Sequence, residues 1–340
     1  MGGAWGLARV AVAATATVAT LGLGDRLDEG RSDGLLTISS TAASVPGIAA
    51  DGTPWRVSRR IAFHRDPPVV PAAPAIAEAR RFAADRAGLV SFAVVDSRGR
   101  HHGLGGDRGY VTASVVKAML LAAELRRLAR EGLELDTTTD AALRAMITYS
   151  DNGAADTIYS RVGDVGLLEV ARSAGMTRFS VEGYWGNAQI TATDMTRLFA
   201  DLDRALPPRF REFGLGLLGS VIPEQSWGIP AGAGERWAVR FKGGWRSTAL
   251  GQLVHQVAEL RDGGRTVAIA VLTDGQPTQA YGIETVRGIA ARLVGPEAER
   301  DRHPARGRPR WPRPGRRATL RAPRWRSRGP GSPGQSSRTG

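Results

Sequence analysis

Apolar residues follow two spacings in the first part of the chain, and the change between them predicts the first elements. In residues 75–87 (AIAEARRFAADRA) they recur at the three- and four-residue intervals of a helix. Residues 89–95 (LVSFAVV) form an almost continuous apolar run, which is typical of a buried strand. The turn-forming residues 96–100 (DSRGR) follow, and residues 101–104 begin a short partner strand. We therefore expect a helix followed by a pair of strands.

The middle of the chain has helical spacing, and its last third returns to strands. A helix is expected from about residue 114 to residue 131, closed by Gly132. Further helical patterns follow at residues 139–148, 153–162, 166–174, 192–204 and 208–218. Strands are expected at residues 237–241, 251–259 and 266–272, and a last helix at residues 278–294. Because a run of helices separates the strands, we predict an α+β domain whose antiparallel sheet is built from both ends, with an inserted helical lobe.

The first 24 residues carry an apolar stretch, residues 10–23, behind Arg9. This layout is typical of a secretory signal, and the stretch is shorter than the ~20 residues of a membrane-spanning helix. We interpret residues 1–24 as a signal peptide or a weak membrane anchor, with a buried helix as the alternative. The chain has no cysteine, which excludes disulfides, a cysteine-based lipid anchor and a cysteine metal site. We expect export to the periplasm, the cell envelope or the medium.

Two segments flank the folded domain expected at residues 77–297. Residues 25–76 are interpreted as an irregular linker that includes the proline-rich stretch 66–74. Residues 298–340 are rich in Arg, Pro and Gly, and 13 arginines against one acid from residue 300 onward place +12 of the net +13 there. Such a segment cannot bury enough surface to offset its ordering entropy, so we predict a disordered tail. The tail is inert and solvated, or it contacts a polyanion.

Lysine is scarce in this chain, which has two lysines, Lys117 and Lys242, and 44 arginines. An arginine guanidinium stays protonated in proteins, whereas a buried lysine amine can lose its proton and act as a base. A lysine that is kept where arginine is otherwise used suggests chemistry that a guanidinium cannot perform. The alternative is codon bias with two chance survivors, so the neighbouring residues decide between the two.

The first lysine belongs to the sequence Ser114-Val-Val-Lys117 at the start of a predicted helix. Residues three apart share a helix face, so the Lys117 amine can reach the Ser114 hydroxyl and activate it as a nucleophile. Free N–H groups at a helix N-terminus also suit a developing oxyanion. By itself this motif is a weak signal, because a serine at a helix start is more often a cap.

Two further motifs follow in the order that acyl-transfer chemistry would require. Ser150-Asp151-Asn152 lies in a break between two helical patterns, where a hydroxyl could relay a proton and an amide could bind a carbonyl. Helix capping is the simpler alternative. Residues 242–245 (KGGW) end an apolar strand, and their two glycines would let an extended substrate approach the strand edge. A plain turn is the alternative there.

Taken together, the three segments resemble a known set of motifs. These are the Ser-x-x-Lys, Ser-Asp-Asn and Lys-Thr-Gly motifs of the serine β-lactamase and penicillin-binding protein superfamily. The resemblance covers about residues 77–296 and is closest to class A β-lactamases. Residues 145–156 (AMITYSDNGAAD) and 190–199 (ITATDMTRLF) also read like helix starts of that class. The resemblance implies a three-layer α/β/α fold and a reaction that needs no metal or cofactor.

The resemblance also implies roles for individual residues. Ser114 would be the acylated nucleophile, Lys117 its base or proton relay, and Ser150 the relay to the leaving nitrogen. On the binding side, the Asn152 amide would hold the substrate amide, and Lys242 would supply positive charge near Ser150 and the substrate carboxylate. The remaining binding residues are Gly244 and Trp245, with the N–H groups of Ser114 and Trp245 forming the oxyanion hole.

Three departures from the family pattern affect the expected activity. Gly243 replaces the threonine or serine whose hydroxyl helps to hold a substrate carboxylate. The stretch between Ser114 and Ser150 is shorter than is usual for class A. The loop at residues 180–189 (SVEGYWGNAQ) is also short, and its only carboxylate, Glu182, lacks the family's spacing to Asn187. Glu182 is therefore a candidate for activating the deacylating water, with simple solvent exposure as the alternative.

The sequence thus predicts an exported, monomeric serine acyl hydrolase that forms an acyl-enzyme at Ser114 and acts on a β-lactam or a related amide. A D-alanyl-D-alanine peptidase, or a hydrolase of another small amide or ester, is the alternative among enzymes. A binding module that holds a cell-wall peptide or antibiotic without turnover is the alternative outside them.

Overall fold

A computed structural model describes residues 68–296 and residue 298. The chain divides into two units at Val70, and the second unit carries the helices and strands described below. The first of these, α1 (Ala73–Ala84), begins within the expected linker. The predicted signal segment, most of the linker and nearly all of the arginine-rich tail lie outside the described residues.

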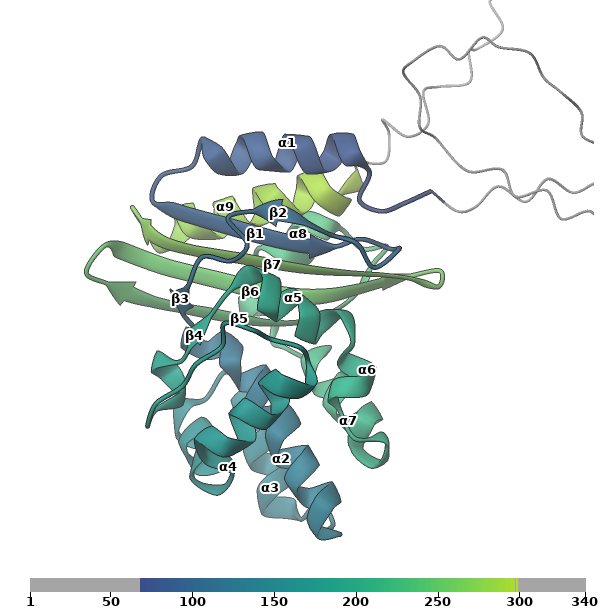
Figure 1. Cartoon of the computed structure of the whole chain (residues 1–340), viewed down its shortest axis with the longest axis vertical. Coiled ribbons are helices and arrows are strands. Elements are labelled where there is room, and N and C mark those ends of the chain that lie inside the picture. Colours follow the sequence, from purple (N-terminus) through teal and green to yellow (C-terminus); the bar gives the residue numbers. More distant parts are fainter. Residues whose placement is uncertain (1–67, 297, 299–340) are drawn as a thin grey trace, which may run out of the picture. The chain divides into compact units, whose positions relative to one another are not determined.

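Five antiparallel strands form the central sheet, and they come from both ends of the domain (Figure 1). The strands are β1 (Leu89–Val95), β2 (His101–Leu104), β5 (Ala238–Thr248), β6 (Gly251–Asp262) and β7 (Arg265–Gln276). Their order is β2-β1-β7-β6-β5, so β1 pairs with β7 across the inserted helices. The predicted fold class is therefore confirmed. A small second sheet pairs β3 (Tyr110–Val111) with β4 (Gln189–Ile190).

Helices cover both faces of the central sheet. On one face lie α1, α8 (Ile229–Ala233) and α9 (Gln279–Val294), and α9 packs on both α1 and α8. On the other face α5 (Ala192–Ala200) packs against β1, β6 and β7. Side chains such as Phe92 and Leu272 are fully buried between these layers, which explains why the first strand reads as a continuous apolar run.

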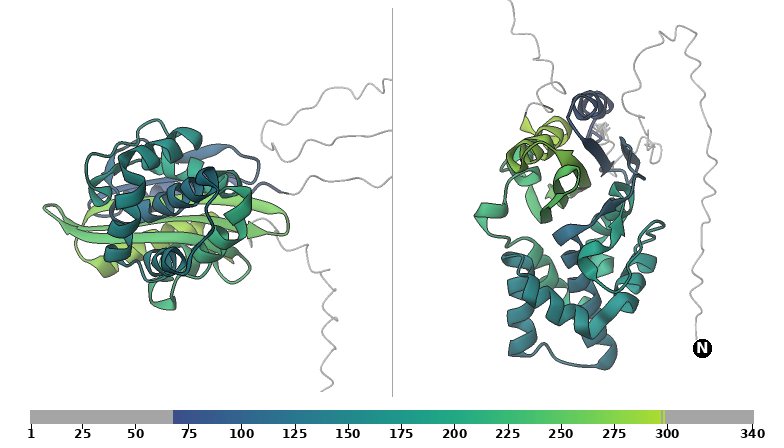
Figure 2. Two further views of the ribbon diagram at one scale, coloured as in Figure 1. Left: turned by 90° about the horizontal axis from the view of Figure 1, so that it is seen from below. Right: turned by 90° about the vertical axis from the view of Figure 1, so that its left-hand side faces the viewer.

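The helical lobe extends from the α5 side of the sheet, and it stays on that side when the view is turned by 90° (Figure 2). Its helices are α2 (Lys117–Glu131), α3 (Thr137–Thr148), α4 (Asn152–Ser173), α6 (Leu202–Ala205) and α7 (Arg211–Leu218). Short 3₁₀ turns complete the domain: η1 (Ala113–Val116), η2 (Trp185–Asn187), η3 (Pro208–Phe210) and η4 (Pro223–Gln225). The backbone of α4 is non-helical at Gly163, which has φ 56°, and this break explains why the sequence predicted two helices there.

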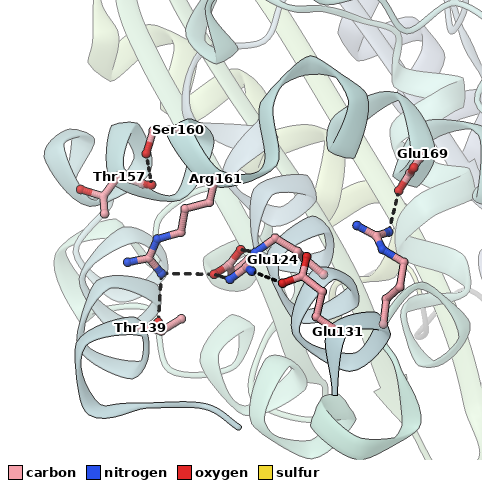
Figure 3. Close-up of polar contacts among 9 residues, drawn as sticks. Glu124, Glu131, Thr139, Thr157, Ser160, Arg161 and Glu169 are labelled. Carbon is pink, nitrogen blue, oxygen red and sulfur yellow. Dashed lines mark hydrogen bonds and ion pairs between the residues drawn. The ribbon is translucent and has the colours of Figure 1, made fainter. Parts of the chain in front are cut away.

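A buried carboxylate joins three helices of the lobe (Figure 3). Glu124 on α2 is fully buried and accepts two hydrogen bonds from Arg127, at 2.8 Å and 2.9 Å. Arg161 on α4 donates to Glu124 at 3.2 Å and to Thr139 on α3 at 2.9 Å. Because a buried carboxylate needs such partners, this network fixes the packing of α2 against α3 and α4.

No described helix is long and apolar enough to cross a membrane.

Candidate active site

Ser114 lies in the 3₁₀ turn η1, which leads directly into α2. The sequence predicted a helix from Ser114, but the α-helix begins at Lys117. The reason lies in the preceding residue, since Ala113 has φ 46°, an uncommon value for a residue with a side chain. This sharp turn leaves Ser114 partly exposed while its neighbours Ala113 and Val115 are buried. Such local strain is often found where a reactive side chain must be presented.

Two hydrogen bonds hold the segment that leads into this turn. Thr112 donates its N–H to the Ala188 carbonyl at 2.8 Å. His255 on β6 accepts a hydrogen bond from the Thr273 N–H at Nδ1, at 3.1 Å. Its Nε2 therefore carries the ring proton and donates to the Val111 carbonyl at 3.0 Å. Burial lowers the pKa of His255 to about 4, so the ring stays neutral and its hydrogen bonds keep these directions. The sequence analysis did not identify His255 as a supporting residue.

Strand β5 passes directly against the start of η1 at Gly244. A Cβ atom added to Gly244 would lie 2.8 Å from the Ser114 nitrogen and 3.0 Å from the Val115 nitrogen, so only glycine fits here without movement. The predicted motif at residues 242–245 lies inside β5, which continues to Thr248, and not at a strand end or in a turn. The two residues expected to supply oxyanion donors, Ser114 and Trp245, are thereby brought to one place.

Lys117 is fully buried, and its amine points to the Ser150 motif. Nζ donates to the Ser150 carbonyl at 2.6 Å, to the Ser150 Oγ at 3.4 Å and to the Asn152 Oδ1 at 2.7 Å. Within the described residues no hydrogen bond joins Lys117 to the Ser114 hydroxyl. Burial lowers the pKa of Lys117 to about 8, and the charges of Asp151 and Asp156 oppose that shift.

The Ser150 hydroxyl lies between the two lysines. It accepts a hydrogen bond from Lys242 Nζ at 3.0 Å, in addition to the longer contact from Lys117. Ser150 has φ 61°, so it holds a left-handed conformation in the break between α3 and α4. Lys242 is fully buried on β5, and burial together with the charge of Lys117 lowers its pKa to about 7. The structure therefore joins all three sequence motifs through one hydroxyl.

The loop before β4 presents an aromatic ring to this centre. The Trp185 ring centroid lies 4.9 Å from Lys117 Nζ, and Trp185 is almost fully buried. Its Nε1 donates to Asp156 Oδ1 at 2.7 Å. Glu182 is exposed, and no described hydrogen bond or ion pair joins its carboxylate to Lys117 or Ser114. The role suggested for Glu182 stays a prediction, and the sequence reasoning did not single out Trp185.

The corner beside Gly243 is also aromatic. A Cβ atom added to Gly243 would meet the Trp227 ring at 3.4 Å, and the Gln256 amide lies on the same side. Trp227 in turn contacts Trp245, with ring centroids 5.7 Å apart and planes at 74°. A Cβ atom at position 243 would therefore be in van der Waals contact with the Trp227 ring. Gly243, which departs from the family pattern, thus lies beside an aromatic pair, Trp227 and Trp245.

Comparison with known proteins agrees with this geometry. Residues 137–295 match the model of the β-lactamase enzyme family. A search of curated proteins gave no match.

Solved structures with the same fold include several β-lactamases. A β-lactamase from Sphaerobacter thermophilus DSM 20745 aligns with a TM-score of 0.58 at 19% identity, over 67% of this chain and 96% of that chain. One from Chitinophaga pinensis DSM 2588 gives 0.60 at 15% identity, over 66% and 99%. An ancestral class A β-lactamase gives 0.56 at 23% identity, over 65% and 98%. The domain therefore has the fold of class A β-lactamases, and residues 137–295 are similar to the β-lactamase enzyme family, as the three motifs indicated.

Proposed function

We propose that this protein is a serine acyl hydrolase that forms an acyl-enzyme at Ser114, with a β-lactam amide as the first substrate to test. The observation that carries the proposal is the position of the Ser150 hydroxyl. It accepts hydrogen bonds from Lys242 and from Lys117, whose helix follows the turn that holds Ser114. Two buried lysines around one hydroxyl have no evident structural purpose, because burial makes their charged forms costly.

In the first step, Lys117 in its neutral form takes the proton of Ser114 Oγ, which attacks the substrate carbonyl carbon. A pKa of about 8 leaves a useful fraction of this amine neutral near pH 7, while a typical lysine would be almost entirely charged. Before this step, Nζ must exchange one of its contacts to Ser150 or Asn152 for the Ser114 hydroxyl. Catalytic hydrogen bonds often tighten only when substrate binds.

The oxyanion is expected to accept hydrogen bonds from the N–H groups of Ser114 and Trp245. The close approach of Gly244, the residue before Trp245, to the Ser114 nitrogen supports this expectation. When the tetrahedral intermediate collapses, the carbon–nitrogen bond breaks and the leaving nitrogen takes a proton from Ser150 Oγ. Lys242 then returns a proton to Ser150 along its 3.0 Å hydrogen bond. The Asn152 side chain, freed from Lys117, would bind the substrate amide.

Two observations favour a second candidate, a protein that is acylated but turns over slowly. The loop carboxylate Glu182 is exposed, and Trp185 instead faces Lys117. The aromatic corner at Gly243 and Trp227 offers no hydroxyl for a substrate carboxylate. An acylated protein of this kind would hold an antibiotic or cell-wall peptide without destroying it. Neutral esters and D-alanyl-D-alanine peptides are the other acyl donors to compare.

Labelling with a fluorescent penicillin tests the proposal. The wild-type protein should be labelled, peptide mapping should place the label on Ser114, and Ser114→Ala should abolish labelling without changing the melting temperature. A label on another residue, or labelling of Ser114→Ala at the wild-type rate, would contradict the assignment.

A further inference from the structure

The Trp185 indole lies beside the proposed base, Lys117. Its ring centroid is 4.9 Å from Lys117 Nζ, and its side chain is only 3% exposed. The turn that carries it, η2, packs directly against η1, the turn that carries Ser114. The indole is therefore next to both the nucleophile segment and its base.

The position of the indole is built into the fold. The Asp156 carboxylate on α4 accepts the Trp185 Nε1–H at 2.7 Å. A second carboxylate on the same helix, Asp164, accepts the Gly183 N–H at 2.9 Å and so ties down the loop just before the indole. Ser180 and Gln189 close the loop through a pair of backbone hydrogen bonds, at 3.2 Å and 2.7 Å. Contacts on both sides of Trp185 thus hold its ring in place.

Loss of the acyl group requires a water molecule and a base beside the Ser114 ester. The water oxygen must attack the ester carbonyl carbon, its proton must pass to a base, and the bond to Ser114 Oγ must break while that oxygen regains a proton. Water and base need to stand within hydrogen-bond distance of each other and beside the ester. An apolar ring at this position offers neither a water site nor a proton acceptor.

We propose that Trp185 is a positioning residue that shields the Ser114 acyl-enzyme from water, so that the acylated protein persists. This inference rests on the proposed acylation of Ser114. The indole face also attracts the Lys117 ammonium, as aromatic rings do with cations at this distance. Trp185 therefore has two separable effects, one on the lifetime of the acyl-enzyme and one on the protonation of Lys117.

Two variants that are nearly isosteric with each other, Trp185→Gln and Trp185→Glu, test the effect of Trp185 on the lifetime of the acyl-enzyme. Each protein is acylated briefly with a fluorescent penicillin, excess reagent is removed, and the loss of label is followed. We expect Trp185→Gln to lose the label about tenfold faster than wild type because the shield is gone. Trp185→Glu should lose the label a further ~10²-fold faster than Trp185→Gln, because a positioned carboxylate can act as general base. Val165→Gln, a change at an exposed residue of α4, should stay within about twofold of wild type.

A readout that a purely structural role would not move is the pH dependence of acylation. Removing the ring takes away an attraction for the ammonium, so the midpoint for Trp185→Gln should fall below that of wild type, while Trp185→Phe should keep it. Should Trp185→Gln fail to fold, Trp185→Leu replaces it, with the same faster loss of label expected.

Two results would overturn the inference. The first is a folded Trp185→Gln or Trp185→Leu protein that keeps its label as long as wild type does. This result would overturn the role of Trp185 and leave the acylation of Ser114 intact. Absence of any label on wild-type Ser114 would overturn the proposed function and this inference with it.

Discussion

Replacing Asp156 with Asn should shift the pH dependence of acylation to lower pH. The Asp156 charge favours the ammonium form of Lys117, and burial opposes that form. Asn keeps an oxygen that can accept the Trp185 Nε1–H, so the substitution changes the charge and leaves the hydrogen bond in place. Because the base must be neutral to accept the Ser114 proton, a lower pKa of Lys117 makes acylation available at lower pH.

The size of the shift follows from the separation of the two charges. Lys117 Nζ lies 4.9 Å from the indole centroid, and the indole Nε1 lies 2.7 Å from the carboxylate. With the ring radius added, amine and carboxylate are at most about 10 Å apart, where Coulomb's law gives ~0.4 kcal/mol in water and ~1.7 kcal/mol at a dielectric constant of ~20. The pKa of Lys117 should therefore fall by ~0.3 to ~1.2.

The assay is the second-order rate constant for labelling by a fluorescent penicillin, measured between about pH 5.5 and pH 9.5 at low salt. The wild-type rate should rise with a midpoint near pH 8, and that of Asp156→Asn should lie lower. Asp140→Asn removes the same charge from a residue paired with Arg144 on α3, and its midpoint should not move. An unchanged or higher midpoint for Asp156→Asn would refute the assignment of Lys117 as the base.

Further predictions concern the lysines, the helical lobe and the tail. Lys117→Arg should impair acylation nearly as much as Lys117→Ala, because a guanidinium cannot accept a proton, whereas Lys242→Arg should have a milder effect. Comparable labelling rates for Lys117→Arg and wild type would contradict this. Glu124→Gln should lower the free energy of unfolding by ~1.5–3 kcal/mol in urea titrations, because it weakens charge-assisted hydrogen bonds from two arginines; a loss under ~0.5 kcal/mol would contradict this. Deleting residues 300–340, which lie outside the described residues, should leave the melting temperature and labelling unchanged while weakening retention on an anionic resin.

The sequence predicted the elements whose local pattern is decisive. The apolar run at Leu89–Val95 is an inner strand, paired with β7 along its whole length and with β2 over its last four residues. The break in helical spacing near Gly163 is a real interruption of α4. Lys117 and Lys242 were notable because the rest of the chain uses arginine, and they meet at Ser150 although 125 positions separate them. Motif order was informative because the topology brings these three segments together.

The remaining features depend on contacts that no local pattern encodes. Trp185 reaches Lys117 only because Asp156 and Asp164 on α4 hold its loop. His255 looked like an ordinary strand residue, yet from β6 it donates a hydrogen bond to the Val111 carbonyl on β3, in the second sheet. The glycines of the β5 motif were read as a strand end, because glycine weakens a strand unless close approach requires it, as at Gly244.

Intact-mass spectrometry after mixing with benzylpenicillin tests the central claim most directly. The account predicts one adduct with the full mass of the antibiotic within minutes, and loss of this adduct more slowly than the ~1 s⁻¹ at the low end of enzyme turnover. Unmodified protein beside intact penicillin would contradict acylation at Ser114. Unmodified protein beside rapidly hydrolysed penicillin, at ~100 s⁻¹ or more, would contradict the slow loss of the acyl group.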